Sequence, residues 1–99
     1  MTSYRVVFSP EARRHLEALT TYIARQSSPD RAVRFARSIV EYCAKLSHMP
    51  HRGIRRDDTR PGLRMIGFRR SVTIVFDTEA ETVTILGIHS RGHDIQLLD

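Results

Sequence analysis

Apolar residues follow a regular period in three segments of the first half of the chain. In residues 4–8, Tyr4, Val6 and Phe8 alternate with polar or smaller neighbours, and a period of two predicts a short strand with one buried face. Apolar residues then recur at helical spacing, which predicts one helix over about residues 10–26 and a second over about residues 29–47. The stripes are formed by Ala12, Leu16, Leu19 and Ile23 in the first helix and by Ala32, Val33, Ala36, Ile39, Val40, Cys43 and Leu46 in the second.

Both predicted helices begin with the same signal. Ser9-Pro10-Glu11 and Ser28-Pro29-Asp30 each supply an N-cap serine, a proline at the first helical position and an acid near the positive end of the helix dipole. Met49-Pro50 closes the second helix, because proline disfavours helical geometry in the residue before it. Since only two or three residues separate the helices, we expect an antiparallel hairpin whose apolar stripes face one way.

The last third of the chain changes to a strand-like period. Residues 63–68, 72–76 and 82–89 are short runs rich in β-branched and aromatic residues, which predicts a three-stranded antiparallel meander. On the middle strand, Val72, Ile74 and Phe76 are assigned to the face under the helices, while Thr73 and Val75 point away. Helices grouped before an antiparallel sheet indicate the α+β class, and we expect a single domain over residues 1–99.

Two further features accompany these elements, one in the last strand and one in a loop. Gly87 within the last strand predicts a bulge or a close backbone approach. Residues 50–61 contain prolines, a glycine and two aspartates with few apolar anchors, so we expect a surface loop with mobile arginine side chains.

Positive charge is concentrated in one segment. The formal net charge is +5, and residues 52–70, which we call the basic strip, hold seven arginines against two aspartates, so this strip accounts for the whole excess. A local strip of arginine implies an acidic partner, either nucleic acid, a ribonucleoprotein or an acidic protein segment. The arginines of the strip are Arg52, Arg55, Arg56, Arg60, Arg64, Arg69 and Arg70.

Several kinds of chemistry lack the residues they require. The five histidines do not present three or four ligands at a spacing suited to a metal ion, and no glycine-rich loop could hold a nucleotide phosphate, so we expect neither a metal nor a cofactor. Ser90, His89 and Asp94 contain the residue types of a hydrolase triad without its strained turn. Cys43 lies on an apolar stripe and is expected to be a buried, inert thiol. With no apolar run of transmembrane length and no secretory signal, we expect a cytoplasmic protein.

The remaining candidates are cations on the predicted sheet. Arg64 lies within a strand and Arg91 follows the last one. A charged residue in a strand can simply face solvent. The functional alternative is that Arg64, His89 and Arg91 lie on neighbouring strands of one exposed sheet face and hold an anion there.

The order of these elements and several specific residues together resemble a known protein family. The chain resembles the ParE/RelE superfamily of toxins from bacterial type II toxin-antitoxin modules. The resemblance covers nearly all of the sequence and implies a small basic toxin neutralised by an antitoxin with an extended acidic segment. It rests on Tyr4-Arg5-Val6, Ser9-Pro10-Glu11-Ala12, Pro50 before Gly53, Gly62-Leu63-Arg64, Ile74-Val75-Phe76, and Ile85-Leu86-Gly87-Ile88-His89 with Arg91 and Asp94.

The resemblance implies one of two activities. RelE-like members are ribosome-dependent endoribonucleases that cut messenger RNA, whereas ParE-like members are described as inhibitors of DNA gyrase. The cation that RelE-like members carry on the third strand falls here on Thr73, and their C-terminal tyrosine falls on Leu97. We therefore favour a gyrase inhibitor that is not itself an enzyme. The alternatives are a ribonuclease that uses Arg64, His89 and Arg91, and a non-toxic member that only binds antitoxin.

The candidate residues for binding the target or the antitoxin follow from the basic strip and the resemblance. We expect the antitoxin segment to fold as it binds, to form a hetero-oligomer with this chain and to pair with Arg64 or its neighbours. The candidates are Arg55, Arg56, Arg64, Arg69, Arg70, His89, Arg91 and Asp94.

Overall fold

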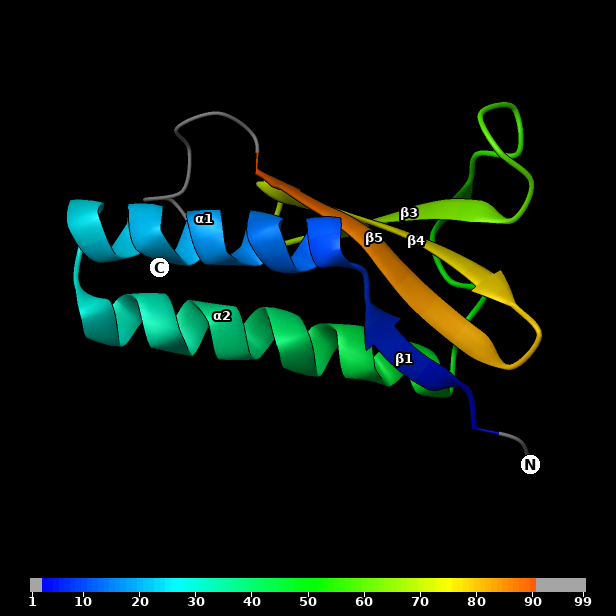
Figure 1. Ribbon diagram of the computed structural model, residues 1–99, viewed down its shortest axis with the longest axis horizontal. Coiled ribbons are helices and arrows are strands. Elements are labelled where there is room, and N and C mark those ends of the chain that lie inside the picture. Colours follow the sequence, from blue (N-terminus) through cyan, green and yellow to red (C-terminus); the bar gives the residue numbers. More distant parts are fainter. Residues whose placement is uncertain (1–2, 91–99) are drawn as a thin grey trace.

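A computed structural model describes residues 3–90 of the chain (Figure 1). A strand precedes two antiparallel helices, and the rest of the described chain is mainly sheet. The α+β class, the helix hairpin and the antiparallel meander are all confirmed. In order, the elements are β1 (Arg5–Phe8), α1 (Pro10–Gln26), α2 (Pro29–Ala44), the 3-10 helix η1 (Lys45–Ser47), β2 (Ile54–Arg55), β3 (Leu63–Phe68), β4 (Val72–Glu79) and β5 (Thr82–Ser90).

The serine caps start both helices as predicted. The Ser9 Oγ accepts a hydrogen bond from the backbone N–H of Ala12 at 3.0 Å, and the Ser28 Oγ accepts one from Arg31 at 3.1 Å. Each bond satisfies an N–H that the first helical turn would leave without an acceptor. The second helix was predicted to reach residue 47, but its last three residues tighten into η1, a common ending for an α-helix.

The five strands within residues 3–90 form one sheet in the order β1-β5-β4-β3-β2. β1 pairs in parallel with β5, and the remaining pairs are antiparallel. The sequence pattern did not predict β2, which lies inside the expected surface loop. Gly53 precedes β2 with a φ of +86°, and a Cβ there would overlap the backbone carbonyl of Met65, so only glycine lets the loop approach β3 this closely.

The core lies between the helix pair and one face of the sheet. Val72, Ile74 and Phe76 are at most 1% exposed and belong to the same buried cluster as the helix residues. This confirms the predicted assignment of the β4 faces. On α2, however, the predicted stripe is partly wrong, because Val33 and Val40 are 53% and 42% exposed. They lie seven residues apart on the flank of α2, and Phe35 is buried in the core in their place.

Gly87 confirms the predicted bulge, and the group that approaches it closely is a side chain rather than a backbone. The register of β4 and β5 pairs Val75 with Gly87 but Phe76 with Ile85, so Leu86 is the extra residue of a β-bulge. A Cβ on Gly87 would lie 2.6 Å from the His89 Nε2. The absent side chain thus provides the space that the His89 ring occupies.

Candidate functional site

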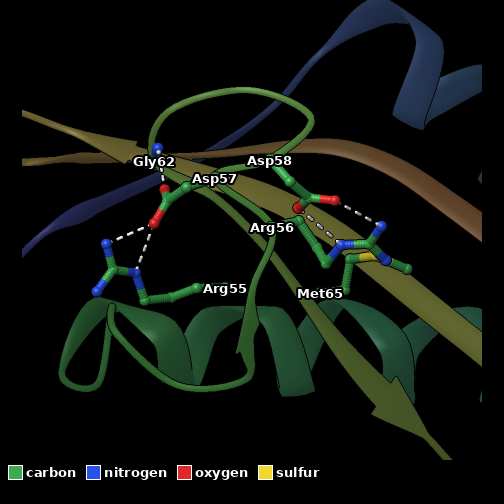
Figure 2. Close-up of polar contacts among 6 residues, drawn as sticks. All are labelled: Arg55, Arg56, Asp57, Asp58, Gly62 and Met65. Atoms are coloured by element: carbon green, nitrogen blue, oxygen red, sulfur yellow. Dashed lines mark hydrogen bonds and ion pairs between the residues drawn. The ribbon is translucent and has the colours of Figure 1, made fainter.

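Ion pairs neutralise much of the positive charge in the loop part of the basic strip. Asp57 and Asp58 each pair with the arginine two residues earlier, Arg55 and Arg56 respectively (Figure 2). Arg60 reaches across to Asp77 on β4. Three of the loop arginines, expected to be mobile, are therefore engaged by carboxylates. The net charge of the strip already counts Asp57 and Asp58, whereas Asp77 lies outside residues 52–70, so its pairing with Arg60 lowers the charge that the strip offers to a partner.

The two aspartates differ in what holds them. Asp57 accepts a hydrogen bond from the backbone N–H of Gly62 at 3.0 Å and one from the Arg55 Nε at 2.8 Å. These two bonds, the Gly62 bond first, hold the pKa of the Asp57 carboxyl below its usual value. The pKa of Asp58 is lowered mainly by its hydrogen bond from Arg56, whose guanidinium also lies 3.8 Å from the Met65 sulfur.

Arg64 takes a different position from the other arginines. On β3 it lies directly opposite Arg55 of β2 and opposite Phe76 of β4. Its Nη1 donates to the backbone carbonyl of His51 at 2.7 Å. This bond fixes the guanidinium near the end of the helix layer, where the chain leaves η1 for β2.

The turn between β3 and β4 presents two arginines in an unusual backbone conformation. Arg69 and Arg70 have φ angles of +50° and +69°, in the left-handed region that non-glycine residues enter at some cost. The Arg69 guanidinium lies 5.0 Å from the ring centre of Phe68 and 5.8 Å from that of Phe35, within the range of a cation–π contact. Arg70 is exposed at the tip of the hairpin.

His89 lies beside a second histidine that the sequence analysis did not single out. The His89 and His15 ring centres are 4.8 Å apart, and the His15 Nδ1 accepts a hydrogen bond from the backbone N–H of Ile88 at 3.2 Å. Burial, and then the charge of His15, lower the pKa of His89. The neutral imidazole is therefore favoured at this position.

The structure does not bring Arg64 and His89 together, so their predicted placement on neighbouring strands is wrong. β4 lies between their strands in the sheet. Arg64 pairs with Phe76 and His89 pairs with Thr73, three residues apart on β4. Residues an odd number apart on a strand point to opposite faces, so the two side chains do as well. Arg91, Asp94 and Leu97 lie outside the described residues.

Cys43 is 0% exposed, and burial raises its pKa to about 12, as befits an inert thiol. Within residues 3–90, no group of three or more His, Cys, Asp or Glu side chains could hold a metal ion. In the same part of the chain, neither α1 nor α2 has the length and apolar character needed to cross a membrane.

Comparisons with known proteins agree with the fold. The family model described as the ParE toxin of the type II toxin-antitoxin system parDE matches residues 6–95. A solved chain from the chromosomal ParDE toxin-antitoxin system of P. aeruginosa has a TM-score of 0.77 at 21% identity, over 89% of this chain and 96% of that one. One from the RelBE2 toxin-antitoxin complex of Mycobacterium tuberculosis has a TM-score of 0.66 at 25% identity, over 92% and 94%. Among curated proteins, no match was found.

The family model matches enough of the chain to show which family it belongs to. It covers nearly the whole described structure, from β1 to the end of β5. The two solved chains named above come from toxin-antitoxin systems and have folds similar to that of this chain. The chain belongs to the ParE toxin family of type II toxin-antitoxin systems.

Proposed function

We propose that this protein is a toxin that binds and inhibits DNA gyrase, and that a cognate antitoxin neutralises it. The observation that carries the proposal is the separation of Arg64 and His89 by β4, on opposite faces of the sheet. Cleavage of RNA needs a cation at the phosphate and proton-transfer groups around the same atom. A binder needs only anchoring side chains and a partner of complementary charge.

Thr73 adds to this argument. It occupies the β4 position directly opposite His89, where a ribonuclease of this superfamily is expected to carry a cation. A threonine there offers a hydroxyl and no positive charge. The face that His89 shares with Thr73 therefore receives no cation from this position.

The test is a supercoiling assay with purified bacterial gyrase and relaxed plasmid. We expect the protein to block supercoiling and to leave linear plasmid after denaturation of the enzyme, the sign of trapped double-strand breaks. Relaxation by a type I topoisomerase serves as the control and should be unaffected. Full gyrase activity at every toxin concentration would refute the proposal.

The alternative is a RelE-like ribonuclease, and one observation favours it. The lowered pKa of His89 keeps its imidazole neutral, the form in which it can accept a proton. Under this alternative, messenger RNA is cut in the presence of ribosomes, and the cutting disappears in His89→Ala. If the protein neither inhibits gyrase nor cuts RNA, and does not arrest growth when expressed alone, it is a non-toxic member that retains antitoxin binding.

Antitoxin binding should depend strongly on salt. We propose that the antitoxin contributes an acidic segment that folds on the toxin and pairs with Arg64 and its neighbours. Because exposed charges are screened within about 10 Å at 0.1 M ionic strength, affinity should fall as salt is raised. Titrations of the purified pair at several salt concentrations measure how the affinity changes with salt. An affinity that does not change with salt would contradict docking on the basic strip.

A further inference from the structure

A small pocket opens where β2 and β3 meet the loop that joins them. Its volume is about 190 Å³. Arg55, Asp57 and Arg64 line it, and Leu63 and Thr78 contribute to the lining. The pocket does not include His89, Arg69 or Arg70, so it is separate from the other candidates described above.

The pocket contains two guanidinium groups that the sheet register places directly opposite each other. Arg55 of β2 is the cross-strand partner of Arg64 of β3, and directly opposed residues share a face. Like charges in this position destabilise a strand pair. An anion between or beside them removes that repulsion, so the arrangement is suited to anion binding.

One anion is already supplied by the chain itself. The Asp57 carboxylate engages Arg55 and the backbone N–H of Gly62 (Figure 2). The positive charge of Arg64 also contributes to the low pKa of Asp57. The pocket therefore stabilises a carboxylate in the free protein, by contacts that a carboxylate from another chain could also make.

Charge within the pocket remains unbalanced after Asp57 is counted. Two arginines face one aspartate. Asp57 binds Arg55, while the hydrogen bond of Arg64 goes to the carbonyl of His51, a neutral acceptor. A guanidinium carries five N–H donors, so Arg64 has donors to offer a second carboxylate, and that carboxylate would make the set neutral.

We propose that this pocket binds one carboxylate of an acidic protein segment, with Arg64 as the anchor and Asp57 as a built-in competitor that occupies Arg55 in the free protein. The inference rests on the proposed function in assigning the segment to the antitoxin, and it does not depend on gyrase. Paired guanidinium donors suit the planar geometry of a carboxylate.

Fixed acids around the pocket favour a protein segment over nucleic acid. Asp57 lies within the pocket and Asp58 follows it along the chain. A nucleic acid strand carries a charge at every nucleotide, spaced about 3.4 Å along the helix axis per strand, so a phosphate seated on Arg64 would bring further phosphates into the neighbourhood of Asp57. A peptide can place a single carboxylate in the pocket with neutral residues on either side.

The first experiment titrates the full chain with a fluorescent peptide in which glutamate alternates with alanine, followed by anisotropy. Arg64→Gln should weaken binding about tenfold or more, because a charge-assisted bond is lost. Arg52→Gln removes the same charge from an exposed position outside the pocket and should cost less than about twofold. Equal losses in the two variants would overturn the proposal, since they would indicate a general effect of net charge.

The second experiment removes a negative charge from the pocket instead of a positive one. Asp57→Asn removes the competing carboxylate and should strengthen peptide binding several-fold. Asp58→Asn makes the same change of charge at the neighbouring pair with Arg56, and it should have a smaller effect. An Asp57→Asn variant that binds no better than Asp58→Asn would refute the role of Asp57. Circular dichroism of all four variants verifies that each is folded.

Two further ligands complete the test. The peptide with glutamine in place of glutamate should not bind, and binding of both peptides alike would overturn the carboxylate assignment. A single-stranded thymidine oligonucleotide of equal charge should bind more weakly and with no special dependence on Arg64. Tighter, Arg64-dependent binding of the oligonucleotide would show a nucleic acid site instead. None of these outcomes alters the supercoiling result. A failure of the carboxylate-binding proposal can therefore be distinguished from a failure of the gyrase proposal.

Discussion

Individual acidic residues decide how much of the basic strip can act on a partner. Asp57 and Asp58 follow Arg55 and Arg56 at a distance of two residues, and both pairs are formed. This spacing is visible in the sequence and predicts that Arg55 and Arg56 are paired, although the net charge of the strip already counts both aspartates. The pairing of Arg60 with Asp77 was not visible, because it depends on how β4 lies beside the loop.

The His15 and His89 contact predicts how stability depends on pH. The folded state lowers the pKa of His89, so between that pKa and the usual value of about 6.5 the unfolded chain binds more protons. The free energy of unfolding should therefore fall as the pH drops from about 6.5 through the folded pKa. Urea unfolding at a series of pH values measures the slope, and His89→Gln should reduce it.

Gly87→Ala tests the same contact from the backbone side. The new Cβ would collide with the His89 ring, which can rotate away at little cost to the fold. Separated from His15, the His89 imidazole should show a pKa closer to its usual value in an NMR titration. An identical pKa in the variant and the parent would contradict the role given to Gly87.

At the scale of elements, helix starts were predictable because their signals are local. Proline and a capping serine act within four residues, so both helices begin where the sequence indicated. β2 could not be predicted, since two residues have no period and Ile54 is 72% exposed. The error at Val33 and Val40 has a similar cause. The apolar stripe shows which side of the helix is apolar, but it does not show how wide the buried part of that side is.

The two serine caps should differ in their contribution to stability. Ser28→Ala removes one capping bond and should cost about 1 kcal/mol. The Ser9 hydroxyl also donates to the carbonyl of Leu86 on β5 at 3.3 Å, so Ser9→Ala should cost about 2 kcal/mol. Urea unfolding of both variants measures the difference, and equal losses would show that the bond to Leu86 contributes nothing.

At the scale of the whole molecule, strand order was the main feature that the sequence left open. The α+β class, the succession of elements and the middle place of β4 in the meander follow from local patterns, whereas the places of β1 beside β5 and of β2 beside β3 are properties of the assembled sheet. In the predicted meander the middle strand already separates Arg64 from His89, so their placement on neighbouring strands did not agree with the predicted order, and the structure shows the separation. The meander itself was predictable, since short connections join its strands.

Removal of β1 should disrupt the whole sheet. β1 covers the edge of β5 along residues 82–85, and Val6 and Phe8 pack against the core. A chain that starts at Ser9 would expose this edge, a template for pairing between molecules, so we expect it to aggregate on expression. Removal of residues 1–3 leaves β1 intact and serves as the control, and a soluble, folded chain without β1 would contradict the prediction.

The parallel pairing of β1 with β5 also has a consequence during translation. Within residues 3–90, β1 has its only sheet neighbour in residues 82–85, so β1 cannot pair until those residues have left the ribosome, and pairings this distant in sequence form slowly. A nascent polypeptide therefore lacks the complete sheet on which a partner could dock. Any protein that captures this molecule by its folded surface does so only after residues 82–85 have left the ribosome.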